Sequence, residues 1–301
     1  MALRLIYRSY GGDNRKGRPE YFDKKACLWS FLRAAEQVAG DVEVVFVNNG
    51  PIAEDRVAVM REHGTIVELP GVGVHESYAA ALDLALDGRW PDTDVVWFSE
   101  DDFLYRPEAF AALEQAAAEL PEADYLGLYG SSPDAPHTQP DPSLHHPRTW
   151  TSLPPWRVGD HEWIRFYSTT ATFGARIGSL RADRGIFRWC TVPHRNMFRD
   201  HDTCLVYQGF EPYSYRRLAR DLVGGAPGTP RERLREAFMA PFMLATNLRS
   251  HRRAGNRRLL VGPSPNLATH VETGYVASGT DWAEVARGAR LWGGQPADVP
   301  A

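Results

Sequence analysis

The first half of the chain alternates apolar runs of strand character with segments of helical periodicity, and this alternation constrains the fold most. The predicted strands cover residues 3–7, 42–47, 65–69, 95–98 and 125–129. Residues 42–47 form a nearly continuous β-branched run, which is typical of a strand covered on both faces. Helical segments are predicted at 21–38, 53–63 and 76–86, with a further helix opened by Pro107. These repeated units predict an α/β fold with a Rossmann-like, mostly parallel central sheet and helices on both faces.

The second half is less regular. Residues 131–162 are rich in Pro, His and Trp and show neither a helical nor a strand period. Beyond them, strands are predicted at 162–167, 172–176 and 259–261, and helices at 201–208 and 230–247, followed by an amphipathic segment at 282–292. A chain of 301 residues allows two modest domains or one elaborated domain.

Composition excludes several classes of protein. The formal net charge of −4 argues against general nucleic-acid binding, which normally needs an excess of basic residues. Three cysteines without a CxxC spacing indicate neither a disulfide framework nor a zinc site. No apolar run approaches the roughly 18 residues of a membrane span, and the first residues lack a signal-peptide pattern. We therefore expect a cytoplasmic protein.

Ligands of open parallel sheets bind beyond the carboxyl ends of the strands, which nominates Ser9, Asn48, Asn49 and the triplet Glu100-Asp101-Asp102. Three adjacent carboxylates repel one another unless a cation or hydrogen-bond donors offset them. A divalent metal that carries a diphosphate is an economical solution, since Mg²⁺ and Mn²⁺ prefer carboxylate and phosphate oxygens. The alternative is a solvated acidic turn before the helix at Pro107.

The segment VVWFSEDDFLYRPEAFAALEQA, residues 95–116, resembles the metal-binding strand and loop of GT-A-fold glycosyltransferases. Its triplet is similar to the EDD version of their DxD motif, as in N-acetylglucosaminyltransferase I. The rest of the chain follows the order of family 2-like transferases. The resemblance implies that Asp102 binds Mn²⁺ or Mg²⁺ directly and that Asp101 and Glu100 contact the sugar and ribose of the donor.

The same resemblance places Ser9, at the end of the opening strand, in the donor pocket. Asn48 and Asn49 stand where the family usually has an Asp-rich turn that reads the uracil and ribose. Gly73 lies in a Gly-containing turn that is neither a Walker nor a Rossmann fingerprint. We expect this turn to let the chain approach the donor.

A second acidic cluster, Arg199-Asp200-His201-Asp202, stands at a predicted helix start. There Asp200 could be an N-cap and Asp202 a first-turn residue favoured by the helix dipole. The resemblance implies instead that Asp200 is the general base, although Arg199 stands where Glu is common. It also implies that His270 completes the coordination of the metal, whereas an isolated loop His more often only forms hydrogen bonds.

Two further segments have alternative interpretations. The basic run 249–258 is either a solvated face or a clasp for a diphosphate or a negatively charged acceptor. Trp150, Trp156 and Trp163 are either core residues or part of a lid that stacks on a sugar.

Together these observations predict a single GT-A-like domain over residues 1–301, with a donor half at 1–130 and an acceptor half with a C-terminal elaboration at 131–301. The expected activity is metal-dependent, inverting transfer of a sugar from a UDP- or GDP-sugar to an acceptor hydroxyl, the acceptor itself being open. One alternative is a sugar-phosphate nucleotidyltransferase, for which the Gly-rich residues 11–18 are a weak phosphate loop. The other is a non-catalytic protein that binds nucleotide sugars on the same scaffold.

Overall fold

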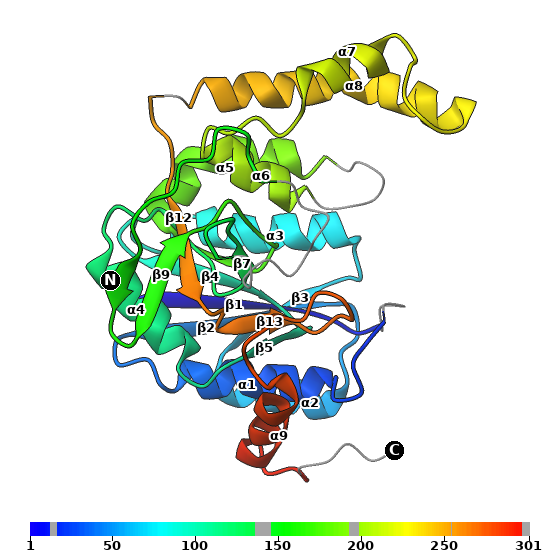
Figure 1. Ribbon diagram of the computed structural model, residues 1–301. Coiled ribbons are helices and arrows are strands. Elements are labelled where there is room, and N and C mark those ends of the chain that lie inside the picture. Colours follow the sequence, from blue (N-terminus) through cyan, green and yellow to red (C-terminus); the bar gives the residue numbers. More distant parts are fainter. Residues whose placement is uncertain (13–16, 136–145, 193–198, 254, 297–301) are drawn as a thin grey trace.

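The computed structural model describes residues 1–12, 17–135, 146–192, 199–253 and 255–296, and a nine-stranded sheet forms its centre (Figure 1). The strand order is β3-β2-β1-β4-β11-β6-β12-β9-β8. Strands β11 and β9 run opposite to the rest. The bounds are Leu3–Tyr10 (β1), Val42–Asn49 (β2), Thr65–Leu69 (β3), Val95–Glu100 (β4), Tyr125–Leu126 (β6), Trp156–Val158 (β8), His161–Arg165 (β9), Phe173–Arg176 (β11) and Leu260–Ser264 (β12). The predicted α/β class with a mostly parallel sheet is confirmed.

Helices cover both faces of this sheet, as Figure 1 shows. One apolar core joins the sheet to α1, α2, α4 and α9, and the other joins it to α3, α5 and α6. The helices span Lys24–Ala35 (α1), Glu54–His63 (α2), Val74–Leu86 (α3), Ala109–Glu119 (α4), Ile177–Cys190 (α5), Asp200–Tyr207 (α6), Tyr215–Leu222 (α7), Pro230–His251 (α8) and Trp282–Trp292 (α9).

The central strands alternate between the two cores because successive side chains of a strand point to opposite faces. In β1, Leu5 and Tyr7 enter one core and Ile6 enters the other. In β4, Trp97 packs with the first group and Val96 with the second. The nearly continuous apolar runs predicted from the sequence are therefore buried on both faces.

The chain order creates a topological switch point between β1 and β4. After β1, the chain builds β2 and β3 on one side, and it then returns to pair β4 with the other edge of β1. In the register, Arg8 lies opposite Glu100, and Ser9 lies opposite Asn48. The polar residues nominated from the sequence therefore end neighbouring strands at one edge of the sheet, where α/β folds bind ligands.

Two small sheets add to this edge. Strand β5 (Phe103–Tyr105) pairs with β13 (Ala268–His270), and the register sets His270 opposite Phe103. The pair β7 (Gly130–Ser131) and β10 (Ser168–Thr169) lies beside α6. The β5–β13 pairing brings a residue from late in the chain next to the acidic triplet, which the sequence pattern did not show.

Some elements differ from expectation. Helix α5 was missed because it follows β11 directly, with Arg176 as its N-cap and no turn residues between them. Helix α7 packs against α8 to form a helical hairpin that lies at one end of the molecule in Figure 1. A capping box of Thr229 and Glu232 starts α8. Residues 136–145 of the predicted 131–162 loop lie outside the described residues.

Candidate functional site

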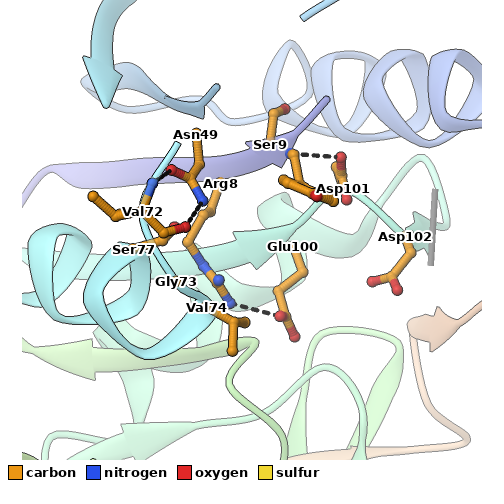
Figure 2. Close-up of a pocket in the computed structure, with 11 residues that line it drawn as sticks. Arg8, Ser9, Asn49, Val72, Gly73, Val74, Ser77, Glu100, Asp101 and Asp102 are labelled. Atoms are coloured by element: carbon orange, nitrogen blue, oxygen red, sulfur yellow. Dashed lines mark hydrogen bonds and ion pairs between the residues drawn. The ribbon is translucent and has the colours of Figure 1, made fainter. Parts of the chain in front are cut away.

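A cavity of about 320 Å³ opens at the carboxyl ends of β1, β2 and β4 and at the first turn of α3 (Figure 2). Its lining includes six of the predicted site residues: Ser9, Asn49, Gly73, Glu100, Asp101 and Asp102. Asn48 is fully buried beside the cavity, where its amide donates to Glu68 at 3.4 Å, and it is not part of the lining. The expectation that ligands bind beyond the carboxyl ends of the strands therefore agrees with the position of the cavity, although Asn48 is not part of its lining.

The side chain of Asn49 fixes one wall of the cavity. Its amide donates to the carbonyl of Val72 at 2.8 Å, and its carbonyl accepts from the Val72 amide at 2.9 Å. The turns on either side use Gly50 (φ 81°) and Gly71 (φ 77°), a left-handed conformation that favours glycine. Asn49 therefore holds the turn before α3 against the end of β2.

The three carboxylates of the triplet are held by different basic side chains. Figure 2 shows Glu100 and Asp102 on one side of the chain and Asp101 turned toward the end of β1. Glu100 accepts from Arg8 Nη2 at 2.6 Å. This pair spans the two central strands, so a charge from β1 neutralises the first carboxylate of the triplet.

Asp101 lies in a basic environment below the end of β1. Its Oδ2 accepts from the Tyr10 amide at 2.9 Å and lies 3.1 Å from Lys24 Nζ and 3.7 Å from Arg56 Nη1. Burial nevertheless raises the pKa of Asp101, with the charge of Asp102 acting in the same direction. The carboxylate is thus enclosed by cations and the backbone and has a structural role in joining α1 and α2 to the sheet.

Asp102 and His270 meet because β13 pairs with β5. His270 Nε2 lies 3.1 Å from Asp102 Oδ2, and Arg18 Nη2 lies 2.9 Å from the same oxygen. Burial acts to raise the pKa of Asp102, but the hydrogen bond and charge of His270, together with Arg18, hold it well below its usual range. The two residues predicted to share a metal therefore lie in contact.

These two side chains offer donor atoms that a divalent cation can take, a carboxylate oxygen and an imidazole nitrogen. In the structure they are hydrogen-bonded directly to each other, Nε2 to Oδ2 at 3.1 Å. Mg²⁺ sites commonly take one or two carboxylates and complete their shell with substrate phosphates and water. Within the described residues, no group of three or more His, Cys, Asp or Glu side chains forms a metal cluster. Two protein ligands, with Arg18 displaced, would therefore have to suffice.

Asp200 is the first residue of α6, and Arg199 rather than Asp200 is the N-cap. Its carboxylate accepts from the His201 amide at 2.8 Å. Burial raises the pKa of Asp200 to about 6, and the nearby charge of Glu100 contributes. In contrast, Asp202 contacts the hydroxyl of Tyr213 and lies 2.8 Å from Arg199 Nε.

Asp200 lies within electrostatic range of Glu100, whose charge contributes to its raised pKa. The pKa of Tyr78, which lies on α3 with Arg8 over its ring at 5.8 Å, is raised well above its usual value by burial and then by the charge of Asp200. The charges of Asp200 and Glu100 thus both act on Tyr78, although Asp200 itself is not part of the cavity lining.

Four basic residues surround the triplet and were not predicted from the sequence: Arg8, Arg18, Lys24 and Arg56. The available signal was the repulsion within the triplet, which requires positive charge or hydrogen-bond donors nearby. From the sequence alone, we expected a metal ion to supply that charge. The structure shows that much of it comes from the protein, through contacts between residues far apart in the chain.

The basic residue Arg258 and the three tryptophans with alternative interpretations do not line the cavity. In the basic run, Arg258 contacts Asp124 at 2.9 Å and Asp183 at 2.9 Å, at the starts of β6 and β12 and so at the sheet edge opposite the cavity. Trp163 is fully buried in the core. Trp156 packs against that core, and Trp150 packs on Tyr167 and Phe210. None of the three indoles lines the cavity.

No family model and no curated protein matches this chain. Among solved structures, it is similar to a 1–349 segment of S. aureus TarS, with 13% identity over 97% of this chain and 65% of that one, at a TM-score of 0.41. The chain thus spans about two thirds of that segment. A TarS complex with UDP-GlcNAc matches at 14% identity and a TM-score of 0.40, covering 68% of this chain and 52% of that one.

Two further similarities are lower in score or coverage. Glucosyl-3-phosphoglycerate synthase from Mycobacterium tuberculosis, in complex with Mn²⁺, UDP and glucosyl-3-phosphoglycerate, matches at 14% identity over 42% of this chain and 43% of that one, with a TM-score of 0.30. CMP:2-keto-3-deoxy-manno-octonic acid synthetase with CTP matches at 17% identity over 80% of this chain and 98% of that one, with a TM-score of 0.38. Among the described helices, none is long and apolar enough to cross a membrane.

Proposed function

We propose that this chain is a glycosyltransferase that moves a sugar from a nucleotide-sugar donor to an acceptor hydroxyl, with inversion. One observation carries the proposal: the cavity at the switch point of the sheet has the Glu100–Asp102 triplet on its wall, and Asp200 lies within electrostatic range of Glu100. Strands from both the 1–130 and the 131–301 halves share one sheet, which supports their action as one domain.

The cavity offers several contacts for a UDP- or GDP-sugar. Arg8 and the N-terminus of α3, with its N-cap Gly73 and first residue Val74, line it together, and both favour an anion such as a diphosphate. The hydroxyl of Ser9 is buried with no hydrogen-bond partner in the described part of the chain, so a ligand could satisfy it. Glu100 would then face the ribose or the sugar, whereas Asp101, although it lines the cavity, is engaged by Lys24 and the Tyr10 amide.

Asp200 is the proposed general base. Its pKa of about 6 lies just below neutral pH, so the carboxylate is ionised and can accept a proton. The acceptor oxygen loses its proton to Asp200 as it forms a bond to the anomeric carbon, while the bond to the nucleoside diphosphate breaks. Asp202 is engaged by Arg199 and Tyr213, which leaves Asp200 as the carboxylate available for this step.

Asp102 and His270 would hold a Mn²⁺ or Mg²⁺ ion, which stabilises negative charge on the departing diphosphate. Arg18 shares the Asp102 oxygen and must move aside when the ion binds. Arg8, paired with Glu100, also lines the cavity, so a diphosphate bound there would lie near a guanidinium group as well as the ion.

The test is product analysis with a panel of UDP- and GDP-sugars, using the native protein, Asp200→Asn and the control Asp160→Asn. Asp160 is an exposed carboxylate between β8 and β9. We expect the native protein and the control to release nucleoside diphosphate, and Asp200→Asn to lose turnover by at least a hundredfold while still binding donor. Turnover by Asp200→Asn at the native rate would contradict the assignment.

A nucleotidyltransferase is the second candidate, and one contact favours it. Arg18, at the end of the Gly-rich segment 11–18, reaches Asp102 at 2.9 Å, so this end of the segment lies beside the triplet. Residues 13–16 of it lie outside the described residues. Pyrophosphate released from a nucleoside triphosphate and a sugar phosphate would support this function, and nucleoside diphosphate released from a nucleotide sugar would support the transferase.

A further inference from the structure

Helix α8 carries an apolar stripe on its outward face. Leu234, Phe238, Pro241, Ala245 and Leu248 recur at spacings of four and three residues, which sets them along one side of a helix. Leu234 is 73% exposed, Phe238 is 80% exposed and Leu248 is 50% exposed. Leucine and phenylalanine at such exposure in one row form a patch, unlike scattered surface residues.

The opposite side of the same helix already makes the packing contacts. Ala240 and Met243 pack with Leu218 of α7, and Asn247 exchanges hydrogen bonds with the Tyr213 backbone at 3.1 and 2.7 Å. The outward stripe is therefore not needed to hold α8 in the fold.

Two further apolar side chains are exposed where α7 ends, in the same helical hairpin. Leu222 is 48% exposed and Val223 is 83% exposed where α7 ends. In Figure 1, the turn between α7 and α8 lies at the end of the hairpin that projects from the rest of the molecule. The exposed side chains Leu222, Val223, Leu234, Phe238 and Leu248 are called the hairpin patch below.

The hairpin is also strongly basic. Residues 215–253 carry nine arginines and three acidic residues, a net charge of +6 in a chain whose net charge is −4. Two of the three acids, Asp221 and Glu236, are buried and paired with arginines. Arg231 and Arg233 are exposed at the start of α8, near Leu234. The surface around the patch is therefore cationic.

We propose that the hairpin patch binds an anionic membrane surface, with its apolar side chains among the lipid headgroups and acyl chains and its arginines near the lipid phosphates. An amphipathic helix with Leu and Phe on one face and arginines beside it binds membranes in this way. A second copy of the hairpin fits less well, because it would bring a net charge of +6 against +6. The hairpin lies beside the proposed base, since Arg199 Nη2 contacts Thr246 of α8 at 3.3 Å.

The test is flotation of the full chain with vesicles of phosphatidylcholine alone and of phosphatidylcholine with 30 mol% phosphatidylglycerol. We expect binding to the anionic vesicles and at least tenfold weaker binding to the neutral ones. Leu234→Ser combined with Phe238→Ser should weaken binding at least tenfold, because both apolar contacts are lost. Arg231→Gln combined with Arg233→Gln should do the same, because each arginine near an anionic surface contributes a factor of about five.

Leu291→Ser is the matched control, because Leu291 is 55% exposed on α9, which lies on the other face of the sheet. It should bind anionic vesicles like the native chain. All variants should keep the native melting temperature, because the replaced side chains are exposed. Equal binding of the native chain and of the Leu234→Ser, Phe238→Ser double variant to anionic vesicles would overturn the proposal. The proposal would also be overturned if light scattering shows that the native chain is a dimer that does not bind vesicles, and that the same double variant is a monomer.

Discussion

Replacing Asp200 by Asn should stabilise the protein while it abolishes transfer. The pKa of Asp200 is raised from an ordinary value of 3.8 to about 6, mainly by burial. A shift of about two units corresponds to about 3 kcal/mol at neutral pH, at roughly 1.36 kcal/mol per unit. The residue is only half-buried, so solvent screening reduces this figure, and we expect a gain of about 1 to 3 kcal/mol from the neutral amide.

The pH dependence of this gain identifies its origin. Above pH 6 the carboxylate is charged in both the folded and the unfolded chain, so the native protein bears the full cost of burying the charge. As the pH falls from 6 toward 4, the folded chain takes up a proton first and the native protein recovers that stability. The advantage of Asp200→Asn should therefore be largest above pH 7 and disappear near pH 4.

Urea unfolding of both proteins at pH 7.5 and pH 4.5 measures the difference directly. In thermal scans at pH 7.5, the variant should melt about 2 to 5 °C higher, given the entropy of unfolding of a chain of this length. The control Asp160→Asn should change neither value. Equal or lower stability of Asp200→Asn at pH 7.5 would refute the view that partial burial destabilises the Asp200 carboxylate.

Three further outcomes follow from single contacts. Arg18→Ala should bind Mn²⁺ at least several-fold more tightly in titration calorimetry without donor. The reason is that the Arg18 guanidinium no longer occupies the Asp102 oxygen predicted to bind the metal. An unchanged affinity for Mn²⁺ would argue against this competition. In Asn49→Ala, the free energy of unfolding measured in urea should fall by about 1 to 3 kcal/mol, because two hydrogen bonds to the Val72 backbone are lost. Asn48→Ala, which loses a single 3.4 Å bond, should cost less, and the reverse order would count against the role of Asn49. In Gly262→Ala, the free energy of unfolding should fall by at least about 1 to 3 kcal/mol, because the new Cβ would lie 2.0 Å from a Phe166 ring atom. A native melting temperature of this variant would contradict this prediction.

The sequence predicted the strands that carry the cavity because their apolar runs are local signals. It also predicted which polar residues end them, since parallel strands end at one edge. The pairing of β13 with β5 was not predictable in this way, and neither was the contact of His270 with Asp102. Such contacts depend on strand pairing between residues more than 150 positions apart. The contacts of Arg18 with Asp102 and of Lys24 with Asp101 were not predictable either, because nothing local marks these basic side chains as partners of the triplet.

The two faces of α8 show a related limit. The helical period over residues 230–247 predicted a helix, and the structure extends it to His251. Periodicity alone could not tell which apolar residues pack inward, because Met243 and Phe238 are both apolar and yet lie on opposite sides. Only the structure identifies the exposed side, because α7 and α6 pack against the opposite side of α8.

The most direct test of the account is a thermal-shift measurement with UDP, UDP-GlcNAc and other UDP- and GDP-sugars, each with and without Mn²⁺. A ligand at a hundred times its Kd stabilises the native state by about 2.7 kcal/mol, which is several degrees for this chain. We predict that at least one nucleotide sugar raises the melting temperature by this amount when Mn²⁺ is present, and that Asp102→Asn loses the metal-dependent part. If no nucleotide sugar shifts the melting temperature under either condition, the cavity at the ends of β1, β2 and β4 is not a donor site.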